Sequence, residues 1–418
     1  MAANILKELK YFKSMPHDMR VLLITNMLYA LVLPVVEIFI GAYIMRNTND
    51  TTLVASFQIA MYTGLVIASF TNGVLLKAFK VNYLYSFGIL LSGISMSGMM
   101  FLSSVTLPGL IIAGLILGGA SGFFWTNRYL MALNTTNDEN RNYFFGLESF
   151  FFTISSIIVP LWIGAVLAKI EGFEILGITF DINKGYQFVT IIVFIITVLA
   201  VISLSRGKFV NPEQKDFLFF KFDKLWNYQM ILAGLKGLVQ GFLVTAPAIL
   251  ILRYVGHEGS LGLIQGVSGA LTAIILYLLG RYTNASHRSI IFAIGITIFM
   301  FGTLYNSIAL SATGVIVFVL CKVFFQPLHD LAYFPIMMKV IDVVSKKENR
   351  NKYAYIMNHE LGLYAGRVLG LGLFIALVYF VSETFALRYA LVIVAALQML
   401  SIPLANLIIK KSYNEDYE

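Results

Sequence analysis

The sequence predicts an all-α polytopic membrane protein, with twelve transmembrane helices in two pseudo-symmetric six-helix bundles. Its 418 residues are 58% hydrophobic and only 12% charged, whereas a soluble domain carries about 25% charged residues. The mean hydropathy is +0.80, and the chain contains 33 glycines, in keeping with the high glycine content of membrane helices. This composition excludes a water-soluble enzyme, and it excludes a disordered chain, which needs low hydrophobicity.

Twelve apolar segments follow one another, each close to the length of about 20 residues that a membrane-spanning helix needs. They are residues 21–45, 52–76, 83–104, 107–133, 142–168, 187–205, 228–252, 259–280, 289–311, 313–341, 353–381 and 384–409. The first lacks a small-residue cleavage site, so we expect it to be retained. We expect an N-terminal bundle over 1–205, a cytoplasmic linker over 206–227 and a C-terminal bundle over 228–418.

The basic residues outside the spans predict the orientation. If the N-terminus is cytoplasmic, 21 Lys and Arg lie in cytoplasmic segments and five lie in outer loops. Basic residues concentrate on the cytoplasmic side, so we expect both termini there and the protein in the cytoplasmic (plasma) membrane. The same distribution explains the net charge of +8 through contact with the lipid bilayer, and we expect no nucleic-acid partner.

Three shorter segments have patterns of their own. Residues 3–14 and 215–226 mix apolar and charged side chains as short interfacial helices do, and residues 173–182 suit a small hairpin. Cys321 is the only cysteine, which excludes an internal disulfide and a multi-cysteine metal site. We expect no metal and no cofactor.

Two local repeats predict that the halves are homologous. Glu139-Asn-Arg141-Asn142 precedes span 5, and Glu348-Asn-Arg350-Asn351 precedes span 11. Glycine-led basic loops also follow spans 2 and 8, beginning at Gly73 and Gly280. The two pairs are offset by nearly the same number of residues, as expected for repeated units.

On these residues the chain resembles the major facilitator superfamily. The family's loop G-x-L-x-D-R-x-G-R is matched by Gly73 and Leu75, with Lys77 at the acidic position. The span-4 motif R-x-x-Q-G aligns on Gly118 and leaves Gly114 at the arginine position, so no coupling role is carried over from that arginine. The span-5 antiporter motif keeps Pro160 and Gly164 alone. The resemblance implies a central cavity lined by spans 1, 4, 7 and 10, with 2, 5, 8 and 11 beside them, exposed alternately as the halves rock.

Eight ionisable side chains lie within the spans, and all fall on those inner spans. Charges there are costly, about 2.5–3.5 kcal/mol each, and mark functional sites. The acids are Glu37, Glu148, Asp330 and Glu360, and the bases are Arg128, Lys236, Lys322 and Arg367.

Depth and residue type suggest roles. We expect Glu37 and Asp330 to carry the coupling proton, because burial and a nearby base act oppositely on a carboxyl group. Pro327 and Pro335 flank Asp330, and a helix broken there would free backbone groups for ligands. A gate or a structural ion pair is expected for Arg128, Glu148, Glu360 and His359. Substrate contacts are expected from Arg367, Lys322, Lys236, Gln240, His329, Tyr29, Trp125 and Asn26, with Lys236 and Gln240 on one helix face.

These features predict a secondary active transporter, coupled to a proton or another ion, that moves a small polar or amphiphilic organic solute. With four bases and four acids, a zwitterion and an amphiphilic anion are equally compatible. The runner-up is a lipid or lysolipid flippase of the same fold, suggested by the aromatic spans. A polytopic enzyme using His329-Asp330 or His359-Glu360 as acid and base comes third, since no nucleophile or phosphate loop accompanies them. We expect a monomer.

Overall fold

A computed structural model describes residues 10, 12–100, 105–136, 140–170, 174–175, 178–179, 181–211, 218–219, 221–282 and 287–414. In these ranges twelve helices are long and apolar enough to cross a membrane, which confirms the predicted number. In chain order they are α2 (His17–Ala30) with η1 (Val35–Phe39) and α3 (Ile40–Thr48), then α4 (Thr51–Leu75), α5 (Val81–Met100), α6 (Leu107–Thr135), α7 (Arg141–Ile170), α8 (Ile182–Leu204), α9 (Lys224–Tyr254), α10 (Glu258–Tyr282), α11 (Arg288–Ala309), α12 (Ala312–Lys347), α13 (Lys352–Phe380), and α14 (Glu383–Met399) with α15 (Ser401–Asn414).

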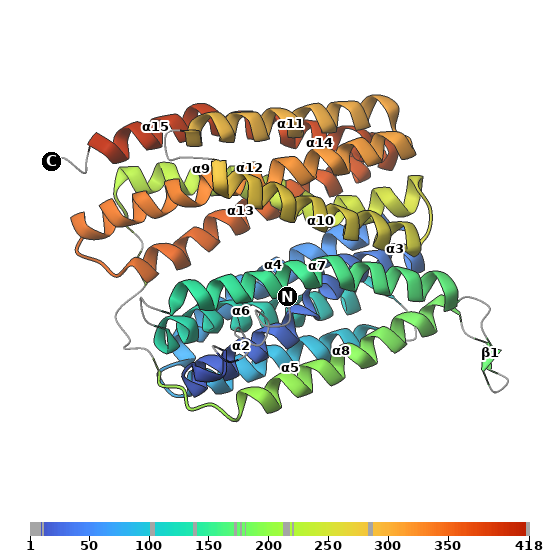
Figure 1. Cartoon of the computed structure of the whole chain (residues 1–418). Helices are drawn as coiled ribbons and strands as arrows, with labels where there is room; N and C mark the ends of the chain where they lie inside the picture. The colour runs from blue at the N-terminus through green and yellow to red at the C-terminus, as the bar shows by residue number, and fades with distance from the viewer. Residues whose placement is uncertain are drawn as a thin grey trace.

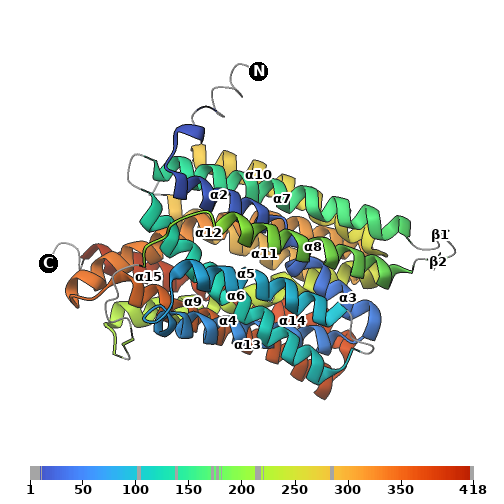
Figure 2. The same cartoon turned by 90° about the horizontal axis from the view of Figure 1, so that it is seen from below.

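The helices form two groups, α2–α8 and α9–α15, which lie one above the other in Figure 1. Helix pairs that pack in the first group have counterparts in the second: α5 on α6 matches α11 on α12, α5 on α8 matches α11 on α14, and α2 on α7 matches α9 on α13. Two seams join the groups, α7 with α10 and α4 with α13, and both are visible in Figure 2. The repeated packing supports the pseudo-symmetry that the sequence predicts.

The two ends of the bundle differ. The end of α8 and the end of α15 lie at one end, which we call the terminal face, and the predicted hairpin, β1 (Glu174–Ile175) with β2 (Ile178–Thr179), lies at the other, the far face (Figure 1). The hairpin is antiparallel and pairs Glu174 with Thr179. Several helices begin at the far face with a side-chain cap, as when Asp50 accepts from the backbone N–H of Thr52. Such caps satisfy backbone donors that a helix start leaves free.

Spans 1 and 12 are less regular than the sequence suggests. In span 1 the α-helix ends at Ala30, and residues 35–39 form a single π-helical turn that contains Glu37. In span 12 the helix is interrupted at Leu400. A π-turn is a common feature of functional sites in helices, and the one in span 1 coincides with the acid that the sequence places there.

The prediction that the helix of span 10 is broken near Asp330 is wrong. Helix α12 runs without interruption from Ala312 to Lys347, with Pro327 and Pro335 inside it. Each proline removes one backbone donor and deprives the carbonyl four residues earlier, that of Val323 or Leu331, of its helical partner, yet the helix continues through both positions. The chemistry at His329 and Asp330 therefore rests on their side chains.

Glycines spaced by four allow helices to approach closely in the N-terminal half. A Cβ atom placed at Gly114, Gly118 or Gly122 of α6 would lie 2.7, 1.8 or 2.5 Å from a carbonyl oxygen of α4. Small residues at this spacing are typical of membrane helix interfaces, where backbones pack directly. Gly114, at the position where the family motif has arginine, thus serves packing.

We expect Gly118→Ala to destabilise the protein and the neighbouring Gly119→Ala to leave it unchanged or slightly more stable. The first methyl group would meet the Met61 carbonyl oxygen at 1.8 Å, whereas nothing lies within 4 Å of the second. Forced overpacking costs about 1–3 kcal/mol, and alanine gains about 0.5–1 kcal/mol over glycine within a helix. Thermal unfolding in detergent measures both variants, and equal melting temperatures would contradict the close packing.

The linker departs from the prediction of a second interfacial helix. Residues 215–217 lie outside the described ranges, the described residues 218–219 and 221–223 are not helical, and α9 begins at Lys224. The guanidinium of Arg350 lies 4.4 Å from the Phe219 ring centroid and 5.6 Å from that of Phe222, so these aromatic side chains pack on the protein. The linker also contacts the N-terminal half, where the Lys208 N–H donates to Asp18. Residues 12–14 of the first expected interfacial helix are helical, and most of its remainder lies outside the described residues.

Candidate functional site

The eight charged side chains within the spans form four opposite-charge pairs. Three are close contacts inside one half: Arg128 with Glu148 at 2.5 Å, Lys236 with Asp330 at 2.6 Å, and Arg367 with Glu360 at 3.7 Å. The fourth, Glu37 with Lys322, is electrostatic and joins the two halves. Each acid thus has a base, as burial of charge in hydrocarbon demands.

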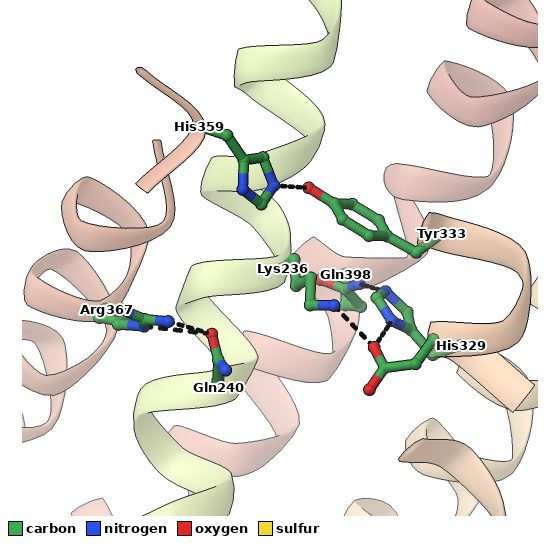
Figure 3. A network of polar contacts seen from close by, with 8 residues as sticks. Lys236, Gln240, His329, Tyr333, His359, Arg367 and Gln398 are labelled. Atoms are coloured by element: carbon green, nitrogen blue, oxygen red, sulfur yellow. Dashed lines mark hydrogen bonds and ion pairs between the residues drawn. The ribbon is translucent and has the colours of Figure 1, made fainter. Parts of the chain in front are cut away.

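Lys236 and Asp330 begin a polar network in the C-terminal half (Figure 3). Lys236 Nζ on α9 donates to Asp330 Oδ1 on α12 at 2.6 Å. The same carboxylate oxygen lies 3.3 Å from Nδ1 of His329, whose Nε2 lies 3.2 Å from Nε2 of Gln398 on α14. The network reaches from the middle of the bundle to a peripheral span, and Asp330 keeps a third of its side chain accessible.

Aromatic rings surround the ammonium group of Lys236. Its Nζ lies 4.2 Å from the Tyr333 ring centroid and 4.0 Å from that of Phe334, within the range of cation–π attraction. Tyr333 is fully buried, and its hydroxyl lies 2.6 Å from Nε2 of His359. His359 is therefore held within the protein, close to the Lys236 network, as Figure 3 shows.

Arg367 is the basic group best shaped for an anion. Its Nε and Nη2 donate to Gln240 Oε1 at 3.1 and 2.7 Å, and its guanidinium lies 4.6 Å from the ring centroid of Tyr62 on α4. The side chain is only 7% exposed, yet Nη1 is buried without a hydrogen-bond partner. Lys236 and Gln240 do share a side of α9, but they bind different helices.

Glu37 and Lys322 belong to opposite halves and lie within electrostatic reach of each other. Lys322 is the charged group that acts on Glu37, and Tyr29 and Tyr62 both lie within reach of the Glu37 charge. Glu37 is exposed, and Lys322 is half-buried. Tyr62 is within electrostatic reach of both Glu37 and Arg367, so one side chain of span 2 lies near charged groups of spans 1 and 11.

Arg128 and Glu148 form a buried cluster in the N-terminal half. Arg128 Nε and Nη2 donate to the two carboxylate oxygens at 2.8 and 2.5 Å, and Asn26 Nδ2 donates to Glu148 Oε1 at 2.6 Å. Tyr85 donates to Asn26, and the guanidinium lies 5.1 Å from the Trp125 ring centroid. The cluster connects α2, α5, α6 and α7, which all belong to the N-terminal half. In this conformation the Arg128–Glu148 pair therefore makes no contact between the two halves.

The remaining expected contact residue, Tyr29, is buried against Phe124, with ring centroids 4.1 Å apart. The structure also adds residues that sequence reasoning missed. Tyr62, Tyr333 and Gln398 each contact a predicted site residue. Tyr333 could have been found, because it lies three residues after Asp330 and shares its helix face. Gln398 is a polar residue in a peripheral span, which is a weaker signal.

Polar contacts between the halves lie at the far face and at mid-depth. At the far face Arg46 pairs with Glu258 at 3.3 Å, and Thr51 donates to Glu383 at 3.1 Å. At mid-depth the hydroxyl of Thr63 lies 3.0 Å from that of Tyr364. These contacts close the far face. Among the described residues no group of three or more His, Cys, Asp or Glu could hold a metal ion.

Two six-helix groups around paired charges are the arrangement of a membrane transporter. The sequence model of one family, the Major Facilitator Superfamily, matches residues 22–371. The chain belongs to this superfamily, is an integral multi-pass membrane protein, and is a transporter, not an enzyme.

Known proteins show how far the likeness extends. An uncharacterized protein of Bacillus subtilis (strain 168), YqgE, is 20% identical over 377 residues, which are 88% of this chain and 84% of the relative. The crystal structure of a D-xylose–proton symporter aligns with a TM-score of 0.66 and 15% identity over 93% of this chain and 96% of its own. The crystal structure of a point mutant of the nucleoside transporter NupG aligns with a TM-score of 0.65 and 13% identity, over 94% of this chain and 99% of its own. The inward-facing, unoccupied crystal structure of a bacterial homolog of the human lysosomal transporter Spinster aligns with a TM-score of 0.62 and 13% identity, over 96% of this chain and 99% of its own.

Proposed function

We propose that the protein is a proton-coupled secondary transporter that moves a small polar or amphiphilic organic solute across the cytoplasmic membrane. The observation that supports this proposal is the retention of four acids and four bases within the spans, where Lys236 holds the one-third exposed Asp330 at 2.6 Å and Arg367 has a buried Nη1 without a hydrogen-bond partner. Charges kept in this position within a bilayer mark a solute or ion path.

We infer different parts in proton coupling for Asp330 and Glu37. Asp330 is held by Lys236 at 2.6 Å and remains one-third exposed. A proton on Asp330 would release Lys236, which would then be free to hold an anionic group or to weaken the link between α9 and α12. Glu37 carries its proton at the interface itself, where neutralising it changes the attraction between the halves.

The orientation belongs to the same proposal. The excess of basic residues at the terminal face supports a cytoplasmic location for both chain ends. Because the far face is closed by Arg46–Glu258 and Thr51–Glu383, we infer that the solute site opens toward the cytoplasm in this conformation.

The experiment is transport into proteoliposomes that contain a pH-sensitive dye. The panel is D-xylose, uridine, 4-aminobutyrate, citrate, tetraphenylphosphonium and lysophosphatidylcholine, each added with and without a protonophore. We expect at least one organic solute to change the lumenal pH, and we expect Glu37→Gln and Asp330→Asn each to reduce that flux at least tenfold. Asp342→Asn, a half-exposed acid paired with Lys352 at the terminal face, is the control.

Other outcomes separate the alternatives. Solute flux with no pH change and no response to the protonophore would contradict proton coupling and leave a uniporter or a transporter coupled to another ion. Movement of lysophosphatidylcholine alone would favour the flippase. Full activity of both acid variants would remove Glu37 and Asp330 from the proton path.

A further inference from the structure

Gln398 is a buried amide in span 12, at the edge of the C-terminal half. It lies on α14 and is 1% exposed, and α14 packs on α9, α11 and α13. Its Nε2 atom lies 3.2 Å from Nε2 of His329 (Figure 3), whereas its Oε1 atom is buried without a hydrogen-bond partner among the described residues. A buried polar atom without a partner costs stability. Packing therefore does not explain an amide at this position, and its contact with His329 is the feature that needs an explanation.

The two ring nitrogens of His329 face different groups. Nδ1 lies 3.3 Å from Oδ1 of Asp330, and Nε2 faces Gln398. The ring is 3% exposed and packs between Phe292 and Phe325, with centroid distances of 4.9 and 5.2 Å. This packing holds the orientation of the ring, so each nitrogen keeps its own neighbour. A neutral imidazole has one N–H donor and one acceptor nitrogen, and the neighbours decide which nitrogen carries the proton.

The contacts on both sides of the ring favour the same tautomer. Asp330 Oδ1 accepts from Lys236 Nζ at 2.6 Å, so this oxygen is an ionised acceptor and favours an N–H at Nδ1 of His329. On the other side, the amide nitrogen of Gln398 can only donate, so Nε2 acts as the acceptor. With the proton on Nδ1, the imidazole donates to the Asp330 carboxylate, and such a hydrogen bond stabilises the ionised form of an acid.

The unpaired Oε1 atom of Gln398 fits the opposite protonation state. One added proton gives the Asp330–His329 pair two protons. One of them lies on Asp330 Oδ1 and is donated to Nδ1, and the other lies on Nε2 of the ring. A half-turn of the Gln398 amide exchanges its nitrogen and oxygen, and Oε1 then accepts from Nε2–H. The same side chain thus provides a donor in one state and an acceptor in the other.

The other polar groups near this pair act on different atoms. The charged and titratable groups are Lys236 of α9, Tyr333 of α12, and His359, Glu360 and Arg367 of α13. Lys236 bonds to Asp330, and Tyr333 stacks on the His329 ring at a centroid distance of 5.5 Å. The groups of α13 bond to Tyr333 or to each other. Within the described part of the chain, Gln398 is therefore the group that is hydrogen-bonded to Nε2.

We propose that Gln398 is a positioning residue that acts through His329 on the protonation of Asp330. It holds the imidazole proton on Nδ1 while Asp330 is ionised, and it accepts from Nε2 when Asp330 is protonated. This inference rests on the proposed function, since it assumes that Asp330 takes up a proton. It extends the proton-binding unit from α12 to α14, which carries none of the eight charges of the spans.

The protonation of Asp330 can be measured without a transported solute. Dicyclohexylcarbodiimide modifies protonated carboxyl groups, and mass spectrometry quantifies the adduct on the Asp330 peptide of the detergent-purified protein over a pH series. We expect Gln398→Met to raise the pH of half-labelling by about one unit, because the ring is then free to turn a lone pair toward Asp330 and the charged hydrogen bond is lost. The control is Asn306→Leu, which removes a buried, unpartnered amide from α11 and should leave the half-labelling pH unchanged.

A substitution of His329 tests whether Gln398 acts through the ring. His329→Asn keeps an amide N–H for Asp330 but has no Nε2 atom, so we expect a half-labelling pH close to that of the wild type. Adding Gln398→Met to this variant should cause no further shift. A double variant that shifts as much as Gln398→Met alone would show that Gln398 acts on Asp330 by another route and would overturn the assignment.

Failure of this inference is distinct from failure of the proposed function. An unchanged half-labelling pH in Gln398→Met would overturn the role of Gln398 and leave Asp330 as a proton site. A shift in Gln398→Met together with full proton-coupled flux in Asp330→Asn would keep the positioning role and remove Asp330 from the transport cycle. An Asp330 carboxyl whose labelling never falls or rises with pH would overturn both.

Discussion

Replacing Glu148 by leucine is expected to lower the free energy of unfolding by about 3–5 kcal/mol, because it leaves a buried charge without its partner. The Glu148 side chain is 1% exposed and that of Arg128 is 10% exposed. Two hydrogen bonds to Arg128 and one from Asn26 would be lost together. The guanidinium would then remain among aromatic rings with no acceptor for its Nε or Nη2.

The double variant Arg128→Met/Glu148→Leu separates charge burial from packing. Replacing both members of a buried pair with apolar side chains is often neutral or stabilising, so we expect the double variant to recover most of the loss. Asp342→Asn removes one partner of the exposed Lys352 pair and should cost at most about 1 kcal/mol. Denaturation in detergent ranks the four proteins. A double variant as unstable as Glu148→Leu would show that the pair is needed for more than neutralising Arg128.

The membrane spans could be predicted well from sequence, because each is a run of about 20 apolar residues that composition alone identifies. All twelve predicted segments correspond to membrane-length helices. The placement of charges on spans 1, 4, 5, 7, 10 and 11 was also readable, since a charge in an apolar run is conspicuous. Helix boundaries within a span were not readable. The π-turn at Glu37 follows Pro34 and the interruption at Leu400 precedes Pro403, but Pro327 and Pro335 leave α12 continuous, so a proline alone does not predict where a span is interrupted.

The partners of the charged residues could not be predicted, because spacing fixes a helix face but not the neighbour opposite. Lys236 and Gln240 lie on one side of α9, yet one contacts α12 and the other contacts α13. The prolines of span 10 misled for a related reason. Local preference predicts a break at Pro327, whereas the surrounding bilayer penalises unpaired backbone and keeps α12 continuous.

The linker shows how tertiary contacts override an amphipathic pattern. Aromatic and charged residues alternate over 215–226, which suits the membrane surface. Phe219 and Phe222 instead pack around Arg350, and Arg350 belongs to the second copy of the repeated Glu-Asn-Arg-Asn sequence. The repeat was visible in the sequence, but its use as an anchor for the linker required the contact itself.

The second large effect is expected at the seam between α7 and α10, where Gly262→Val should open the far face. A Cβ atom at Gly262 would lie 2.3 Å from the Pro160 carbonyl oxygen and 2.7 Å from the Gly164 Cα. Both contacts are with backbone, which cannot move aside without separating the helices. Pro160 and Gly164 are the two residues of the span-5 motif that this chain keeps, so their retention has a packing reason.

The expected result is a population shift rather than unfolding. In an alternating-access protein the closed and open arrangements of a face differ by a few kcal/mol, and a clash confined to one of them raises its free energy alone. A clash of about 1.4–2.8 kcal/mol would change the ratio of the two states by about 10–100-fold. The Arg46–Glu258 and Thr51–Glu383 contacts would open together with the seam.

Distances between spin labels measure this shift. In a Cys321→Ser background, labels at Lys184 and Val381 report the far face, and labels at Lys80 and Lys346 report the terminal face. Gly262→Val should lengthen the first distance and shorten the second. Gly372→Val on α13, where nothing lies within 4 Å of the added Cβ, should leave both distances as in the parent. If Gly262→Val separates the far face while the terminal face stays apart, the two faces move independently, and the closure at α7 and α10 is not part of an alternating-access cycle.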